Sequence, residues 1–561
     1  MEAPALTTTD GQLVVGDIPA PPPGLQPRPA LLAQLNRASQ KPPVVLTGVW
    51  GAGKTQLAAT YARARLADSW RLVAWVNART SETLLAGLTA VAEAAGLSAG
   101  GSRPGLADAG QAVRDWLEAD GSFRLLVFDD AEDPGLLRPF VPAAGEARVL
   151  ITAAREPIAE LGTSVPVDVF SAEEALALLD GRTGLADEDG ALAVAVQLGY
   201  LPLALDQAAG MIAKQHLGYA AYLAKLRALS AEDHLIREDE DEEEEEEQPS
   251  PPGVAEAVLL AMEATSVADR LGVSIAVMEL MATLSPAVVR RDLLHSAGQS
   301  GTLLGGGRRV AASMMDQALE RLNERSLLGF SLDGQAVSVH RLAARVIRAG
   351  LARQGRLGPA CRVAASALEG SVALANHPDH AAVMEMLGQV AALADNAGAA
   401  ADDPGEELPA TLTRLRSLGL NHLVELGGAM PHAIAVGEPL LADLDRLLGP
   451  EHPDTVRARS DLARAYHQTG RVADAVPLVE QVLAARERLF GAEHARTLTA
   501  RNNLASAYRA IGRAAEAIGL FEQNVAACER LFGADHPKTL ASRHSLDLAR
   551  QESAQAGNEA S

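Results

Sequence analysis

Short apolar runs alternate with amphipathic segments over the first third of the chain. The runs are "PPVVLTG" at 42–48, "RLVAWVNA" at 71–78, "RLLVFDD" at 124–130 and "ARVLITA" at 147–153. Runs of this kind are typical of buried strands. Helical patterns lie before and between them, at 30–38, 54–67, 82–95 and 107–117. Strands that alternate with helices predict a mostly parallel sheet with helices on both faces.

Helical patterns dominate from "VPVDVFSAEEALALL" to about Leu229, and a further helical segment spans Val254 to Arg348. This second segment contains "LLGFSLDGQAVSVH", whose "LDGQ" centre is typical of a hairpin turn. Helices that end in a small hairpin predict a winged-helix domain. Between the two segments, Glu238 to Glu247 are ten consecutive acidic residues. Because like charges repel at this density, we expect a solvated linker. A contact with a basic partner or an autoinhibitory contact is the alternative.

The last third of the chain contains an internal repeat. "GPEHPDT" begins at Gly449, "GAEHART" at Gly491 and "GADHPKT" at Gly533, a spacing of 42 residues. Each unit has the pattern of two helices, with Gly at the turn and Ala at the helix crossing, and a divergent unit begins near Leu408. Such units bury their apolar faces only by stacking, which predicts a curved solenoid with a concave groove.

Length, charge and cysteine content narrow the class of protein. A chain of 561 residues predicts about three to four domains. The formal charge of −23 argues against a broad nucleic-acid surface, although the acidic run supplies ten of these charges. Cys361 and Cys528 match no metal or redox spacing, which fits a reducing cytoplasm. The N-terminus has no signal-peptide pattern, and no apolar stretch approaches the length of a membrane span.

The sequence "VVLTGVWGAGKT" contains the phosphate-binding motif G-x-x-x-x-G-K-[ST], after an apolar strand and before a helix. In this motif backbone N–H groups point at phosphate oxygens. We expect Lys54 to reach the outer phosphates and the Thr55 hydroxyl to ligate Mg²⁺. Trp50 occupies a free position, where a side chain can point away from the phosphates. The candidate cofactor-binding residues of the loop are Gly48, Gly51, Gly53, Lys54, Thr55 and Gln56.

Acidic residues at the end of a neighbouring strand complete the predicted site. Asp129 follows four apolar residues and is the better candidate for the Mg²⁺ shell, whereas Asp130 can orient or deprotonate an attacking water. In the alternative, both acids only cap the next turn. Arg155, after the strand "VLITA", is a candidate sensor of the terminal phosphate or an ordinary surface cation. The candidate catalytic residues are Lys54, Asp129, Asp130 and Arg155, and the candidate metal ligands are Thr55 and Asp129.

The order of these motifs resembles the NB-ARC branch of the STAND signalling ATPases. "GVWGAGKT" is similar to the first motif of that family, "RLLVFDDAED" to the second, "ARVLITAAR" to the sensor strand, "LGYLPLALDQAAG" to the GxP motif and "VSVHRLAARVIR" to the histidine motif. The resemblance covers about Leu25 to Arg348. The C-terminal repeats resemble tetratricopeptide units of kinesin-light-chain length, a combination common in bacterial members.

The resemblance implies roles for two further residues. Pro202 would pack against adenine, and His340 would contact the phosphates of ADP and latch the winged helix onto the nucleotide domain. If the resemblance is set aside, the alternative is that Pro202 only starts a helix and that His340 is an ordinary core histidine. The chain departs from the family pattern at Pro27, where the family has Gly in the segment that frames adenine, and at Arg341, where immune receptors often have Asp.

The predicted fold class is an α/β P-loop nucleotide-binding domain followed by an all-α helical domain, a winged helix and an α-solenoid of tetratricopeptide repeats. The predicted segments are a disordered Pro-rich arm at 1–24, the P-loop domain at 25–170, the helical domain at 171–230, an acidic linker at 231–253, the winged helix at 254–350, a helical connector at 351–406, the repeats at 407–550 and a tail at 551–561.

The leading functional hypothesis is a switch driven by ATP and ADP with Mg²⁺. A protein or peptide ligand in the repeat groove would control nucleotide exchange and oligomer formation, hydrolysis would be slow, and a separate effector protein would carry the output. One alternative is a scaffold with a structural nucleotide that is never hydrolysed. The other is a DNA-binding regulator that uses Arg308 and Arg309 of the winged helix.

Overall fold

The computed structural model describes residues 6–7, 12–39, 43–97, 106–154, 156–237, 253–285, 288–374, 380–398, 407–426 and 430–559. The chain divides into two compact units. Residues 1–102 and 106–411 belong to the first, and residues 412–561 make up most of the second.

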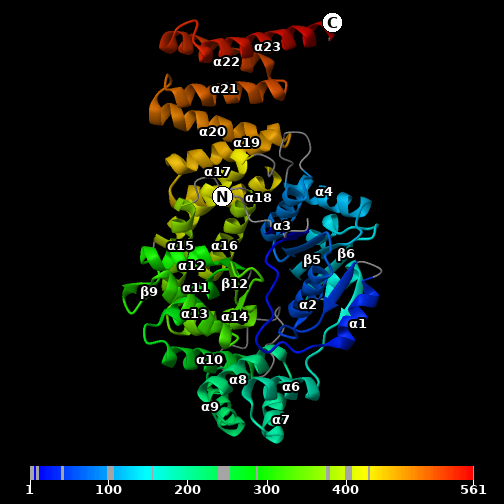
Figure 1. The fold of residues 1–561 in the computed structure, drawn as a ribbon. Helices are drawn as coiled ribbons and strands as arrows, with labels where there is room; N and C mark the ends of the chain where they lie inside the picture. Colours follow the sequence, from blue (N-terminus) through cyan, green and yellow to red (C-terminus); the bar gives the residue numbers. More distant parts are fainter. Residues whose placement is uncertain are drawn as a thin grey trace. The chain divides into compact units, whose positions relative to one another are not determined.

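Seven strands form the large sheet of the first unit, in the order β1-β2-β4-β5-β6-β3-β7 (Figure 1). The strands are β1 (Leu6–Thr7), β2 (Leu13–Val15), β3 (Val44–Thr47), β4 (Leu72–Asn77), β5 (Arg124–Ala131), β6 (Arg148–Ala153) and β7 (Thr163–Pro166). Neighbouring strands are parallel except β1, which pairs antiparallel with β2. The predicted mostly parallel sheet is therefore confirmed.

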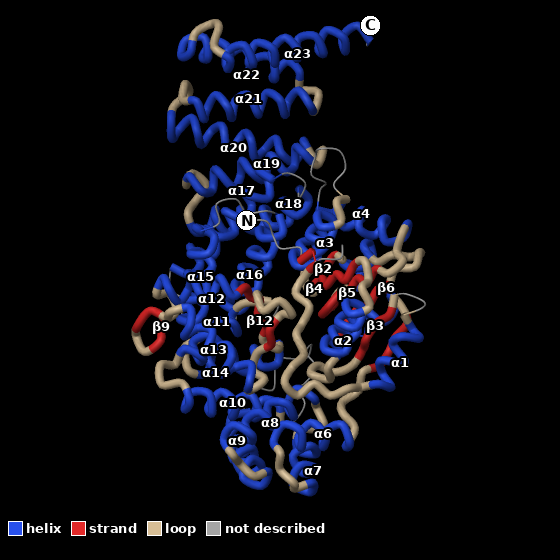
Figure 2. Tube along the Cα trace, in the orientation of Figure 1, coloured by secondary structure: helices blue, strands red, loops and turns tan. Residues whose placement is uncertain are grey.

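Helices cover both faces of this sheet (Figure 2). The helices are α1 (Pro29–Ala38) and α2 (Lys54–Ala67) on one face, and α3 (Ser81–Ala94) and α4 (Leu106–Ala119) on the other. Successive side chains of a strand point to opposite faces. Thus Val44 and Leu46 pack with α1 and α2, whereas Val45 packs with α3 and α4. Burial on both faces explains why these strands are continuous apolar runs.

The structure corrects the prediction of a disordered arm over residues 12–24, whereas residues 1–5 and 8–11 lie outside the described residues. Leu13 to Val15 form β2 and pair with β4. Ile18 is only 1% exposed and belongs to the hydrophobic core between α2 and the sheet. The Ala20 N–H donates to Phe330 O at 2.9 Å, and the Leu332 N–H donates to Ile18 O at 2.7 Å. The proline content hid this segment. Its prolines stand at positions 19 and 21–23, after β2, so they interrupt neither its pairing with β1 nor its pairing with β4.

Short helical segments connect the last strands, and four helices follow them. The connecting segments are α5 (Pro134–Leu137), η1 (Arg138–Phe140) and η2 (Glu156–Leu161). The four helices after the sheet are α6 (Ala172–Thr183), α7 (Glu188–Gln197), α8 (Pro202–Gln215) and α9 (Tyr219–Arg237). Helix α6 begins with a capping box, in which Ser171 and Glu174 each bond the backbone N–H of the other. Helix α9 continues to Arg237, and the acidic run lies outside the described residues.

A second set of helices and short strands completes the first unit. Its elements are α10 (Val254–Ala268), α11 (Val273–Thr283), β8 (Val289–Arg290), α12 (Arg291–Ser300), β9 (Leu304–Gly305), β10 (Arg308–Arg309), α13 (Ala312–Glu324), β11 (Gly329–Phe330), β12 (Ala336–Ser338), α14 (Arg341–Arg353), α15 (Leu357–Leu374) and α16 (His380–Gly398). Strands β11 and β12 are antiparallel, and Gly334 has a φ of 69° in the turn. The predicted hairpin is confirmed, and β8 adds a third strand to it.

The second unit is a stack of antiparallel helices (Figure 1). Its helices are α18 (Met430–Leu447), α19 (Pro453–Gln468), α20 (Val472–Phe490), α21 (Ala495–Ala510), α22 (Ala514–Phe532) and α23 (Pro537–Glu559), and α17 (Glu407–Leu426) precedes them. Ala475 and Ala517 are buried, as the repeat pattern predicts. The Tyr508 hydroxyl donates to Glu480 at 2.6 Å, and Tyr466 makes the same bond to Glu438 one repeat earlier.

Two further expectations concern the cysteines and the membrane. Cys361 and Cys528 are both buried and unpaired with one another. None of the helices in the described part of the chain combines the length and the apolar character that a membrane span requires.

Candidate functional site

The phosphate-binding loop connects β3 to α2, and its glycines have backbone angles that other residues rarely adopt. The φ angles are 145° at Gly48, 83° at Gly51 and 95° at Gly53. A Cβ atom on Gly48 would lie 2.2 Å from Val167 O, so no other residue fits there without a shift of the backbone. Gly53 is the N-cap of α2, which directs the helix N-terminus and its unpaired N–H groups toward the loop.

Lys54 opens α2 and folds back over the loop. Its Nζ donates to Gly48 O at 2.7 Å and to Val49 O at 2.9 Å. Burial and, second, the neighbouring positive charge of Arg341 together lower the pKa of Lys54 to about 8. A phosphate group at the loop would favour the charged amine and offset both effects.

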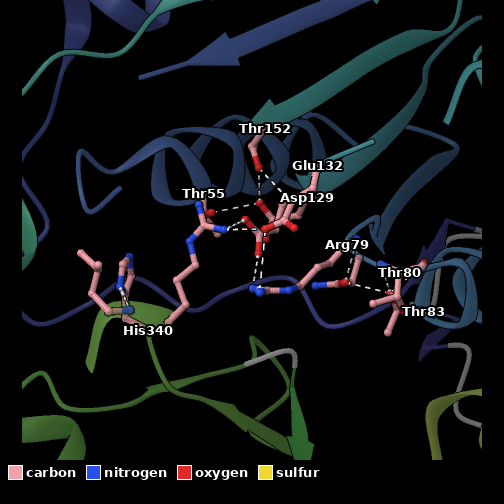
Figure 3. Close-up of polar contacts among 12 residues, drawn as sticks. Thr55, Arg79, Thr80, Thr83, Asp129, Glu132, Thr152 and His340 are labelled. Carbon is pink, nitrogen blue, oxygen red and sulfur yellow. Dashed lines mark hydrogen bonds and ion pairs between the residues drawn. The ribbon is translucent and has the colours of Figure 1, made fainter. Parts of the chain in front are cut away.

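Asp129 lies at the end of β5, beside Thr55 (Figure 3). Its Oδ1 accepts a hydrogen bond from the Thr55 hydroxyl at 2.9 Å and one from the Thr152 hydroxyl at 2.6 Å. The residue is 9% exposed, and burial raises the pKa of its carboxyl to about 6. A hydroxyl and a carboxylate side by side are oxygen ligands of the kind that Mg²⁺ takes together with phosphate. The residues present therefore fit the predicted Mg²⁺ site.

Asp130 has a φ of 58° and lies at a register shift in β5. Arg79 Nη1 lies 3.4 Å from Asp130 Oδ2, and Arg341 Nη1 lies 3.3 Å from Asp130 Oδ1. Glu132 pairs with the same two arginines, at 3.8 Å from Arg79 and at 2.9 Å from Arg341. Sequence reasoning missed Arg79 and Glu132. The only signal was their position just after predicted strands.

Pro202 is the first residue of α8, which begins beside the loop. The Leu203 N–H lies 3.4 Å from Gly51 O, and a Cβ on Gly51 would lie 3.0 Å from the Leu201 side chain. The structure therefore brings the predicted adenine-side residue close to the phosphate loop. Arg28 also reaches this region, since its Nη1 donates to Asp168 O at 2.9 Å.

His340 is the N-cap of α14, and its Nδ1 accepts the Leu342 N–H at 3.2 Å. Burial and, second, the charge of Arg341 together lower the pKa of the imidazole to about 4. The ring is therefore neutral at pH 7. Because Nδ1 accepts a hydrogen bond, the proton is on Nε2, which can donate to an anionic ligand. Lys54 and Asp130 are close enough to influence the same ring.

Trp50, Gln56 and Arg155 are the remaining residues near this site that the sequence analysis singled out. The Trp50 ring is not free in solution, because the Arg341 guanidinium stacks over it at 3.8 Å and Arg345 lies at 5.7 Å. Gln56 lies in the first turn of α2, where its Oε1 is buried without a hydrogen-bond partner among the described residues. Arg155 lies outside the described residues.

The described residues contain no group of three or more His, Cys, Asp or Glu side chains that fits a metal ion. This leaves Thr55 and Asp129 as the protein's part of the predicted Mg²⁺ site. Mg²⁺ bound with a nucleotide needs only one or two protein oxygens, because phosphates and waters supply the others.

Fold and site together define a P-loop α/β domain that is followed by a helical domain and by C-terminal tetratricopeptide repeats. This is the architecture of the STAND-type P-loop ATPases that the sequence resembles. The tetratricopeptide repeat family model matches residues 455–496 and 497–538, which confirms the repeats.

The chain is similar to two regulatory proteins of Streptomyces. It is 29% identical over 280 residues to the regulatory protein AfsR of Streptomyces coelicolor (strain ATCC BAA-471 / A3(2) / M145), an alignment that covers 45% of this chain and 26% of the relative. It is 30% identical over 200 residues to the regulatory protein AfsR of Streptomyces griseus, which covers 32% of this chain and 19% of the relative. The chain thus spans about a quarter or less of the curated relatives it matches.

Two solved structures share features with the chain. One is a signal transduction ATPase with numerous domains (STAND) and a tetratricopeptide repeat sensor from Pyrococcus horikoshii, at 14% identity and a TM-score of 0.43, covering 96% of this chain and 78% of that one. The other is a Walker-type ATPase of Pyrococcus abyssi, at 13% identity and a TM-score of 0.28, covering 58% of this chain and 96% of that one.

Proposed function

We propose that the chain is a signalling switch that binds ATP and ADP at the loop of residues 48–55. The observation that carries this proposal is the convergence of Lys54, Thr55 and Asp129 with His340 of α14 around one phosphate loop. A catalytic P-loop alone does not require a histidine from a segment almost 300 residues further along the chain. A switch needs a second movable segment that the nucleotide can influence, and His340 places α14 in that position.

Each site residue has a definite part in this proposal. The loop amides and Lys54 bind the phosphates, while Thr55 and Asp129 hold Mg²⁺, which neutralises phosphate charge when it is bound. Asp130 orients the attacking water, and Arg155 senses the terminal phosphate. Pro202 lies against adenine, Gln56 lies beside the phosphates, and the neutral His340 donates to the ADP phosphates from α14. Hydrolysis resets the switch slowly.

The tetratricopeptide repeats supply the input of the proposed switch. A protein or peptide ligand in their groove favours nucleotide exchange in the first unit, and the ATP form assembles into an oligomer that recruits a separate effector protein. A ligand can move this equilibrium only by binding the two forms with different affinity, so about 3 to 5 kcal/mol of difference is needed for a decisive change. The relatives named as regulatory proteins support a signalling role.

The winged-helix interpretation of residues 254–350 rests on helices α12 and α13 and on the sheet of β8, β11 and β12. In this proposal the segment carries His340 and packs against the nucleotide domain. A DNA-binding role has less support, since Arg308 and Arg309 form a two-residue strand and Glu324 ends the following helix. A scaffold with a structural nucleotide remains the other alternative.

The test is the nucleotide content of purified protein. We expect the full chain to retain ADP, and Lys54→Ala to lower the extracted nucleotide at least tenfold, because the ammonium contact with phosphate is lost. Lys538→Ala is a matched control, since this lysine lies on α23 in the repeats. Equal nucleotide in Lys54→Ala and in the parent protein would refute binding at this loop.

A further inference from the structure

Arg341 has an unusual combination of contacts for a residue adjacent to the predicted latch. Its guanidinium lies over the Trp50 ring at 3.8 Å, and its Nη1 contacts Glu132 at 2.9 Å and Asp130 at 3.3 Å. The side chain is 14% exposed. One residue of α14 thus contacts both the phosphate-binding loop and the acids that follow β5.

The contacts of Arg341 leave part of its guanidinium unused. Among the described residues, its hydrogen bond and its ion pairs all involve Nη1. A guanidinium carries five N–H donors in a planar fork, so the donors on Nη2 and Nε remain available to a ligand. The stacking on Trp50 fixes the plane of the fork, which reduces the conformational entropy that a ligand contact would cost.

The charged groups around the site sum to zero, but the two cations at the loop, Lys54 and Arg341, favour an anion between them. Lys54, Arg79 and Arg341 bring three positive charges, and Asp129, Asp130 and Glu132 bring three negative charges. The positive charges of Lys54 and Arg341 repel one another across the loop. A phosphate group between these two cations would add two attractions that outweigh their repulsion. Lys54 is expected at the outer phosphates, so the group that suits Arg341 is the terminal phosphate of a triphosphate.

We propose that Arg341, held in place by Trp50, distinguishes a triphosphate from a diphosphate at this loop. The unused edge of the guanidinium contacts the terminal phosphate, so Arg341 raises the affinity of the site for ATP relative to ADP. His340 and Arg341, which are consecutive in sequence, then respond to different phosphates. This inference rests on the proposed nucleotide binding and adds the regulation of that site.

The test compares two probes on the full chain after removal of bound nucleotide. Calorimetric titration with Mg²⁺ and either ADP or a non-hydrolysable ATP analogue gives both dissociation constants. We expect Arg341→Ala to weaken the analogue by about 10-fold to 100-fold, the usual range for a charge-assisted hydrogen bond, and ADP by no more than about twofold. Arg341→Lys should restore part of the analogue affinity, because it returns the charge without the planar fork.

Two variants separate this role from a merely structural one. Arg345→Ala is the matched control, because Arg345 lies on the same helix and over the same ring but farther from it, at 5.7 Å. We expect it to leave the ratio of the two constants unchanged. Trp50→Ala should lower the preference for the analogue, and Trp50→Phe should retain most of it.

The outcomes distinguish this inference from the proposed function. An equal loss of both nucleotides in Arg341→Ala would show that the residue only supports the fold, and an unchanged ratio would show that it does not contact the terminal phosphate. Either result overturns the inference while nucleotide binding stands. If the parent protein binds neither probe, the proposed function and the inference both fail.

Discussion

The ionised carboxyl of Asp129 lowers the stability of the fold, and the same residue is a candidate ligand of Mg²⁺. It is buried at the end of β5, where two hydroxyl donors only partly compensate the loss of water around its charge. The pKa of about 6 means that the folded chain binds a proton there more tightly than the unfolded chain does. Ionisation of Asp129 therefore destabilises the fold, fully above about pH 6 and not at all below the unfolded pKa.

We predict that Asp129→Asn stabilises the first unit at pH 7 by about 1 to 3 kcal/mol while it weakens nucleotide binding that depends on Mg²⁺. The amide keeps an oxygen that accepts from Thr55 and Thr152 but carries no charge, and one pKa unit corresponds to about 1.4 kcal/mol. Thermal unfolding at pH 7 and near pH 4 measures the effect. The gain should shrink at the lower pH, where the parent carboxyl is protonated in the fold. A variant that is less stable than the parent at both pH values would contradict this account.

The places of Lys54, Thr55 and Asp129 could be predicted from their neighbours in the chain, because a local motif or a strand end fixes each of them. Their roles in binding stay predictions. Sequence reasoning could not find the pairs of Arg341 with Glu132 and Trp50, because these contacts join segments more than 200 residues apart. Trp50 was expected only to leave the phosphates clear, whereas it forms the surface on which α14 rests.

At the scale of elements, the repeats illustrate how small residues set the distance between helices. Ala517 is fully buried in α22, in a cluster with Leu504, Tyr508 and Phe521. The 42-residue period made this position predictable, because Ala475 recurs one unit earlier. The short strands β2 and β7 were not predictable in the same way, since neither three apolar residues in β2 nor four residues of mixed polarity in β7 are enough to give a clear period.

We predict that Ala517→Leu destabilises the repeats by about 1 to 3 kcal/mol, because added methyl groups have no space between the helices. Hydrogen exchange on the full chain should show faster exchange in α21 and α22. Ala515→Leu is the matched control, because Ala515 is exposed on the same helix and its substitution should change stability by less than about 0.5 kcal/mol. Equal protection in the two variants would mean that the helices do not cross closely at Ala517.

At the scale of the whole molecule, the central feature is the number of segments that meet at the phosphate loop. Helix α8 contacts Gly51 through its first turn, and α14 reaches the same loop through Arg341. The order of these segments was predictable from the motifs. Their contacts were not, because the residues that join them are ordinary cations and acids in the sequence.

We predict that His340→Ala speeds the release of ADP and promotes oligomer formation, because α14 loses a neutral donor to the phosphates. Release of a fluorescent ADP analogue and light scattering measure the two effects. His422→Ala, a substitution outside the first unit, is the control. Unchanged release together with unchanged size would remove His340 from the switch.

The most direct test of the central claim is a calorimetric titration of the folded full chain with ADP and Mg²⁺, beside the same titration of Lys54→Ala. The account predicts one binding site per chain in the parent protein and a loss of affinity of at least tenfold in the variant. No heat of binding in a parent protein that is folded and free of nucleotide, or equal affinity in the two proteins, would contradict it.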